Sequence, residues 1–147
     1  MTVIQLTLWE IIDALSRQLP FTKEKIERTL SINLNEPIYY GKDASRFFTS
    51  ENLGLKNNVV VSKIDFRTKP DGAGPGFLVL NFEGACIGIA EIRHHYKTLE
   101  ITASPRGNSL DEATNFSTIQ HWGELSFGFK ERRPECLAYV VLNPLSR

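Results

Sequence analysis

Apolar and polar residues alternate most clearly between residues 76 and 104, and this alternation predicts three consecutive antiparallel strands. With Glu83-Gly84 as a two-residue turn, Leu80 lies opposite Ile87, and one face of the sheet becomes apolar. A second turn at Lys97-Thr98 extends the same meander. We therefore expect one core face and an opposite face that is polar toward the second turn.

Helical spacing replaces alternation in the first thirty residues. Thr7 and Glu10 match the capping-box pattern and predict a helix over residues 8–18, which Pro20 ends. A shorter helix is expected over residues 23–31 behind a Thr22 cap. The apolar stripe of the first helix, which must bury against another element, is Leu8, Ile11, Ile12, Leu15 and Leu19.

The remaining segments complete the predicted fold. Residues 33–57 read as a long irregular connection with a helical turn near 43–48, and residues 106–120 read as a polar loop. Strands are expected over 59–68, with Val60, Ile64 and Phe66 on one face, over 124–130, and over 136–143. Both faces of the last strand are apolar, so it is expected inside the sheet and not at its edge. The pattern predicts one α+β domain over residues 1–147, with two N-terminal helices packed on an antiparallel sheet of about five or six strands.

Charge and cysteine content restrict the classes of function. Lys plus Arg and Asp plus Glu each number 17, so no overall basic field favours direct binding of nucleic acid. The first residues lack the basic and long apolar segments of a signal peptide or membrane span, which favours a cytoplasmic location. Cys86 and Cys136 are then expected as two buried free thiols, with a cross-strand disulfide as the alternative.

The chain contains no recognised catalytic motif, and we expect no metal and no cofactor. Adjacent residues on a strand point to opposite faces, so His94 and His95 are not expected to chelate one metal ion. In the predicted register His95 lies opposite Glu100, with Arg93 and Glu91 beside it. This face is interpreted as a solvated charged surface or, alternatively, as an acid–base or ligand-binding site.

The segment from residue 111 to 124 combines carboxylates with aromatic side chains, a mixture typical of protein interfaces. Trp122 or Phe116 would supply an apolar anchor, and the alternative is a loop whose Trp folds back onto the core. Tyr39-Tyr40 with Phe47-Phe48 form the other aromatic cluster, interpreted as core closure. The residues predicted to bind a partner are Asp111, Glu112, Phe116, His121, Trp122 and Glu124.

Two short capped helices, Thr7 to Glu10 and Thr22 to Ile26, precede the meander and the later segment Trp122-Gly-Glu-Leu-Ser-Phe-Gly-Phe. In this order, and in its size and even charge, the chain resembles small bacterial immunity proteins that neutralise contact-dependent or other polymorphic toxins. It also looks loosely like helix-then-meander domains of the β-lactamase-inhibitor-protein type. The resemblance implies binding of a protein partner without a lipid or cofactor. Our hypothesis is a cytoplasmic immunity protein that occludes a toxin, for example a nuclease.

Overall fold

The structure is a computed structural model that describes residues 1–36, 46–50, 52–68 and 76–144. Within these residues the chain forms three α-helices, one 3-10 turn at Lys56–Asn58 and nine strands. The helices are α1 (Leu8–Ser16), α2 (Lys23–Leu30) and α3 (Ile89–His95). The strands are β1 (Thr2–Val3), β2 (Arg46–Ser50), β3 (Leu53–Gly54), β4 (Val59–Thr68), β5 (Phe77–Gly84), β6 (Glu100–Ala103), β7 (Ala113–Gln120), β8 (Gly123–Lys130) and β9 (Tyr139–Pro144).

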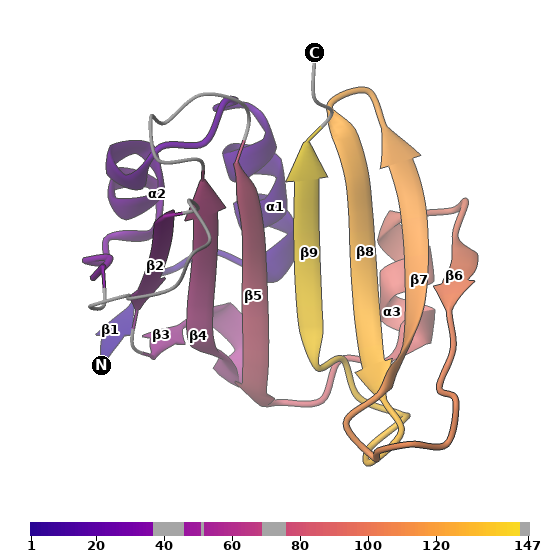
Figure 1. Cartoon of the computed structure of the whole chain (residues 1–147). Helices are drawn as coiled ribbons and strands as arrows, with labels where there is room; N and C mark the ends of the chain where they lie inside the picture. Colours follow the sequence, from indigo (N-terminus) through magenta and orange to yellow (C-terminus); the bar gives the residue numbers. More distant parts are fainter. Residues whose placement is uncertain (37–45, 51, 69–75, 145–147) are drawn as a thin grey trace.

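All nine strands belong to one sheet, ordered β1-β3-β4-β5-β9-β8-β7-β6, with β2 paired to β4. Every pairing is antiparallel except that of β1 with β3. The three helices lie behind the sheet in Figure 1, with α2 behind the β2–β4 side and α3 behind the β7–β8 side. The chain leaves β5, builds α3 and β6 to β8, and returns as β9 beside β5. The interior position expected for the last strand is confirmed.

The two N-terminal helices are also confirmed. Thr7 Oγ1 accepts a hydrogen bond from the Glu10 amide at 3.2 Å, and the Glu10 carboxylate accepts one from the Thr7 amide at 2.9 Å, which satisfies two amides that the helix leaves unpaired. The helix ends at residue 16, earlier than predicted. Its buried residues are Leu8, Ile11, Ile12 and Leu15, four members of the predicted stripe.

The predicted three-strand meander is wrong in its middle strand. Gly84 has φ +81° and ends β5, but the chain then leaves the sheet instead of turning back, and residues 89–95 form α3. The segment satisfies helical spacing as well as alternation: Ile92 is buried, and Ile89 and Tyr96 pack against the core beside it. Glu91 near the helix start and basic residues in its last turn also match the helix dipole.

The strand count is larger than expected because segments interpreted as connections also join the sheet. Residues 113–120 form β7, not a loop, and residues 46–50 form β2, where a helical turn was expected. The rest of that expected turn, like Tyr39-Tyr40, lies outside the described residues. In β4 the buried residues switch parity at a bulge between Val61 and Lys63, so Val61, and not Val60, shares the core face with Ile64.

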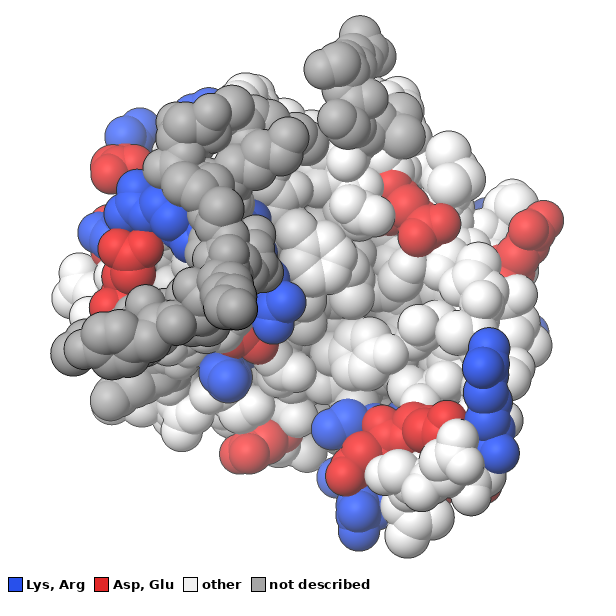
Figure 2. All heavy atoms as spheres, viewed as in Figure 1, with Lys and Arg blue, Asp and Glu red and all other residues white. Residues whose placement is uncertain are grey.

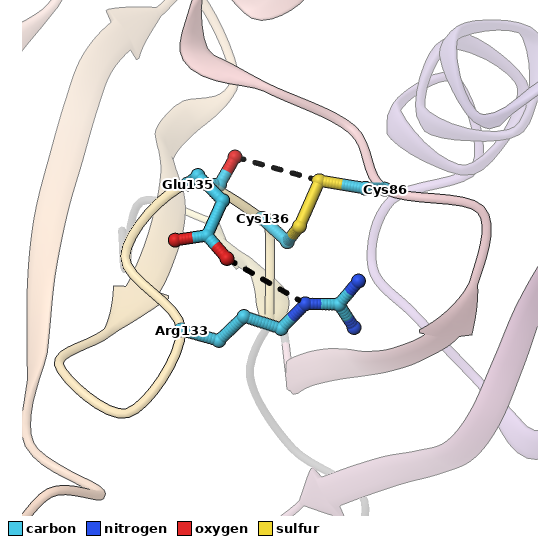
Figure 3. The surroundings of a disulfide bond; sticks show 4 residues. All are labelled: Cys86, Arg133, Glu135 and Cys136. Carbon is cyan, nitrogen blue, oxygen red and sulfur yellow. Dashed lines mark hydrogen bonds and ion pairs between the residues drawn. A yellow bond between two sulfur atoms is a disulfide. The ribbon is translucent and has the colours of Figure 1, made fainter.

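The two cysteines form a disulfide, so the expectation of two free thiols is wrong for this structure. Cys86 follows β5, Cys136 precedes β9, and their Cα atoms are 5.0 Å apart, within the normal range for a bridge. Figure 3 shows the bridge where these two segments meet, beside Arg133 and Glu135. Free thiols were expected because the sequence favours a cytoplasmic, reducing location, and the disulfide was the alternative.

Candidate functional site

The two faces of the sheet have different environments. The core face carries Leu78 and Leu80 of β5 together with Val140 and Leu142 of β9, all at most 1% exposed. The opposite face, which is toward the reader in Figure 1, is not covered by any of the three helices. We use the name open face for the part of this surface that lies on β5, β9, β8 and β7. Its residues are Val79 and Asn81 of β5, Tyr139 and Val141 of β9, Glu124, Ser126 and Gly128 of β8, and Asn115, Ser117 and Ile119 of β7.

Tyr139 organises the middle of the open face. Its ring lies flat over Gly128 on the neighbouring strand, so closely that a Cβ at Gly128 would collide with the ring. The hydroxyl donates a hydrogen bond of 2.5 Å to Asn115 Oδ1 one strand further along. Burial raises the pKa of the Tyr139 hydroxyl, although the bond to Asn115 acts in the opposite direction. The phenol is therefore neutral near pH 7 and fixed in one position.

A second line of hydrogen bonds crosses β8, β7 and β6. The hydroxyls of Ser126 and Ser117 are 2.7 Å apart, and the hydroxyls of Ser117 and Thr102 are 2.8 Å apart. Ser117 and Ser126 are buried although they belong to the open face. These bonds fix the three hydroxyls relative to one another and hold the three strands in one arrangement.

Charged side chains lie toward the margins of the open face, where Glu124 is the one charged residue of the set that defines it. Figure 2 shows neutral residues across its middle and charged side chains toward its margins. On the β4 side, the Lys63 ammonium lies 3.5 Å from the Asp65 carboxylate, and Glu124 is a half-buried acid on β8. Such a surface lacks the dense cations that hold a phosphate backbone, and it suits an uncharged, largely apolar counterpart.

The residues predicted to bind a partner are divided between the two ends of the β7–β8 hairpin. His121 and Trp122 form the turn at one end, and Glu124 lies close to it on β8, opposite Ile119. Trp122 is only 8% exposed, so the structure supports the alternative in which it caps the core. His121 is exposed, and Glu124 is the one predicted residue that belongs to the open face.

Asp111 and Glu112 lie at the other end of the hairpin, roughly 25 Å away for a strand of this length. The Glu112 carboxylate accepts hydrogen bonds from the amides of Arg106, Asn108 and Ser109 at 3.1, 2.7 and 3.0 Å. These amides, Arg106 first, lower the pKa of Glu112. Asp111 pairs with Arg132 at 3.3 Å in an exposed ion pair. Glu112 therefore holds its own loop together, which leaves Asp111 as the freer carboxylate.

Phe116 points to the helix side of the sheet. Its ring meets Phe129 edge-on with centroids 5.7 Å apart, and the Arg93 guanidinium lies 5.9 Å from the Phe116 centroid. The ring is partly buried against the core. Phe116 thus secures α3 to the sheet and belongs to a different face from Glu124.

The alternative site of Glu91, Arg93, His95 and Glu100 does not form one sheet face. The first three residues lie on α3, and Glu100 begins the edge strand β6. His95 instead stacks on Trp9 of α1, with ring centroids 4.1 Å apart. Burial lowers the pKa of His95, and His94 acts in the same direction. The pair is a contact between helices, with no carboxylate hydrogen-bonded to the imidazole among the described residues.

A shallow cavity of about 580 Å³ lies at the β1 end of the sheet. Its described lining contains amides, hydroxyls and apolar groups and no carboxylate, His or Cys side chain. The lining is Met1, Thr2, Ser31, Ile32, Asn33, Asn35, Ser50 and Asn52.

In comparisons with known proteins, no family model, no curated protein and no solved structure matches this chain. In the part of the chain that the structure describes, no three His, Cys, Asp or Glu residues are placed to hold a metal ion. No helix among the same residues has the length and apolar character needed to cross a bilayer. The open face is therefore the candidate site, and its functional interpretation rests on its geometry.

The sequence interpretation missed most of this site. Asn115, Ser117 and Ile119 were assigned to a loop, although they alternate with residues that face the core side. That alternation was the available signal, but the polar character of residues 106–120 as a whole concealed it.

Proposed function

We propose that this protein is a binding module that recognises a partner protein through the open face. The observation that carries the proposal is a sheet face that no helix covers, with an uncharged middle in which Tyr139, Asn115, Ser117 and Ser126 are already fixed by hydrogen bonds. Surfaces rich in Tyr, Ser, Asn and Gly are typical of protein recognition, because Tyr gives rigid contact area and the small polar residues give hydrogen bonds.

Fixed side chains also reduce the cost of association. An immobilised side chain typically costs about 0.5–1.5 kcal/mol when it is ordered only on binding. Tyr139 and Asn115 are already ordered, and Val79 and Val141 beside them offer apolar area at the centre. Glu124 and His121 lie at the margin, where charges affect association rate more than affinity.

The finer proposal is the class of partner. We propose an immunity protein that binds and neutralises a cognate bacterial toxin, as the sequence resemblance implies. The open face supports binding, and the toxin as occupant rests on the resemblance. The sequence predicts a cytoplasmic site of action, whereas the Cys86–Cys136 bridge favours an oxidising one.

The test uses two matched substitutions on opposite faces of the sheet. Ile119 is 70% exposed on the open face, and Ile101 is 60% exposed on the helix side of the neighbouring strand β6. Ile119→Lys and Ile101→Lys therefore add the same charge at similar exposure. The ligand is sought in the adjacent reading frame: a toxin-like domain encoded there is purified, and its binding is measured by titration calorimetry.

We expect Ile119→Lys to weaken binding at least tenfold and Ile101→Lys to leave it within about twofold of the wild type. Both variants should keep the wild-type circular dichroism spectrum. Equal effects of the two variants would exclude the open face as the interface. Absence of binding by the wild-type chain would contradict the immunity role itself.

A further inference from the structure

The Cys86–Cys136 bridge lies at the junction of the two halves of the sheet. β4 and β5 share eight residue pairs, as do β7 and β8, whereas β5 and β9 share four, from Leu78–Leu142 to Asn81–Tyr139. The bridge joins Cys86, which follows β5, to Cys136, which precedes β9. It therefore lies beyond the Asn81–Tyr139 pair at the end of the β5–β9 pairing. Backbone bonds continue toward it, because the Phe82 amide donates to the Ala138 carbonyl at 2.9 Å.

The same junction crosses the open face near its β5 side. Asn81 lies beside Tyr139, and Val79 lies beside Val141, across the β5–β9 pairing. A covalent bond at one end of this short pairing holds the β5 part of the face in register with the β9 part. The binding surface therefore depends on a bond whose formation is set by the redox conditions around the protein.

Cytosolic thiol systems keep most protein cysteines reduced, and structural disulfides belong to oxidising compartments. Cys136 is 6% exposed, and the Leu137 amide donates to the Ile87 carbonyl at 2.8 Å beside the bridge, so the bond is part of the packed structure. We propose that this protein acts in an oxidising compartment, with the bridge formed, and meets its partner there. That the protein meets its partner in this compartment rests on the proposed function, whereas the compartment itself is inferred from the disulfide.

The chemistry needs a disulfide-containing oxidant, supplied by that compartment. The exposed Cys86 thiolate attacks a disulfide of the oxidant, which forms a mixed disulfide and releases one thiolate. The Cys136 thiolate then attacks the Cys86 sulfur and releases the second thiol. Two protons and two electrons pass from the protein to the oxidant, and one sulfur–sulfur bond replaces another.

Action in an oxidising compartment restricts the class of toxin that the protein would bind. A toxin neutralised in an oxidising compartment is bound there, outside the reducing cytosol, wherever its own target lies. A nuclease neutralised in the cytosol, the example that the sequence hypothesis used, becomes the disfavoured case. The neutral middle of the open face is consistent with this, because it lacks the acidic surface that would mimic nucleic acid.

The compartment is tested on the protein in its host cells. Cells are quenched with acid, and the protein is alkylated with a maleimide-polyethylene glycol, with or without prior reduction, and detected by immunoblot. We expect no adduct without reduction and two adducts after it. Cys86→Ser/Cys136→Ala should give no adduct in either sample. Adducts on most of the wild-type protein without reduction would overturn the proposal.

The role of the bridge at the junction is tested by hydrogen exchange. Reducing the purified wild-type chain should speed exchange of the Asn81 and Tyr139 amides at least tenfold, and amides in β7 should change less. Unchanged exchange at the junction would remove the bridge from the binding surface. An oxidised protein that binds no toxin domain would defeat the proposed function alone, and a protein that is reduced in its host cells and still binds one would defeat the compartment alone.

Discussion

Removing the disulfide should cause a large loss of stability. The bridge closes a loop between residues separated by 50 positions, which contains α3 and strands β6 to β8. The chain-entropy relation for a loop of this length gives about 4 kcal/mol at 25 °C. Domains are typically stable by about 5–15 kcal/mol, so the loss is a substantial part of the total. Cys86→Ser/Cys136→Ala is the suitable variant because Cys86 is exposed and Cys136 is buried.

The assay is equilibrium unfolding in urea, followed by far-UV circular dichroism. We expect the free energy of unfolding to fall by about 3–4 kcal/mol, with the helix and sheet signals retained in water. Reductant should lower the wild-type midpoint and leave the double variant unchanged. A loss below about 1 kcal/mol in the free energy of unfolding would contradict the stabilising role of the disulfide, because the loop would then be held in place without the bond.

Three further predictions concern individual side chains. Gly128→Ala should lower stability by about 1–3 kcal/mol in urea unfolding, because the new methyl group collides with the Tyr139 ring; an unchanged midpoint would mean that the ring moves freely. The lowered pKa of Glu112 gives its loop stability that is present above the unfolded pKa of about 4.3 and lost as the pH falls through the folded value. Glu112→Gln should therefore speed hydrogen exchange of the loop amides at pH 7, and equal rates would exclude this role. The lowered pKa of His95 should give an NMR titration midpoint below about 6.5, which Trp9→Ala should raise; a midpoint insensitive to Trp9→Ala would show that the stacked ring does not cause the shift.

Segments whose pattern fits only one type of secondary structure were predicted correctly. The Thr7 capping box and the strand containing Leu125 and Phe127 each combine a periodic apolar stripe with clear end signals. The apolar last strand was placed inside the sheet for the same reason, because both of its faces had to be covered.

The error in the meander arose where a short segment satisfied two periods. Ile89, Ile92 and Tyr96 fit a helix, while the same stretch also alternates. Seven helical residues are too few for sequence spacing to decide, and packing of Ile92 at 0% exposure decides it. The disulfide and the open face depend on this choice, because only the excursion through α3 brings Cys86 beside Cys136 and leaves β5 to pair with β9. The sequence could therefore predict the fold class but not the site.

The proposed binding of a partner protein at the open face is tested by capture from the native host with matched baits. The baits are the wild-type chain, Val141→Lys at the centre of the open face, and Ile101→Lys on the other side of the sheet, all checked by circular dichroism. We predict one host protein that is captured by the wild type and Ile101→Lys and lost with Val141→Lys, as measured by quantitative mass spectrometry. The same captured proteins on all three baits, or a loss confined to Ile101→Lys, would contradict the claim.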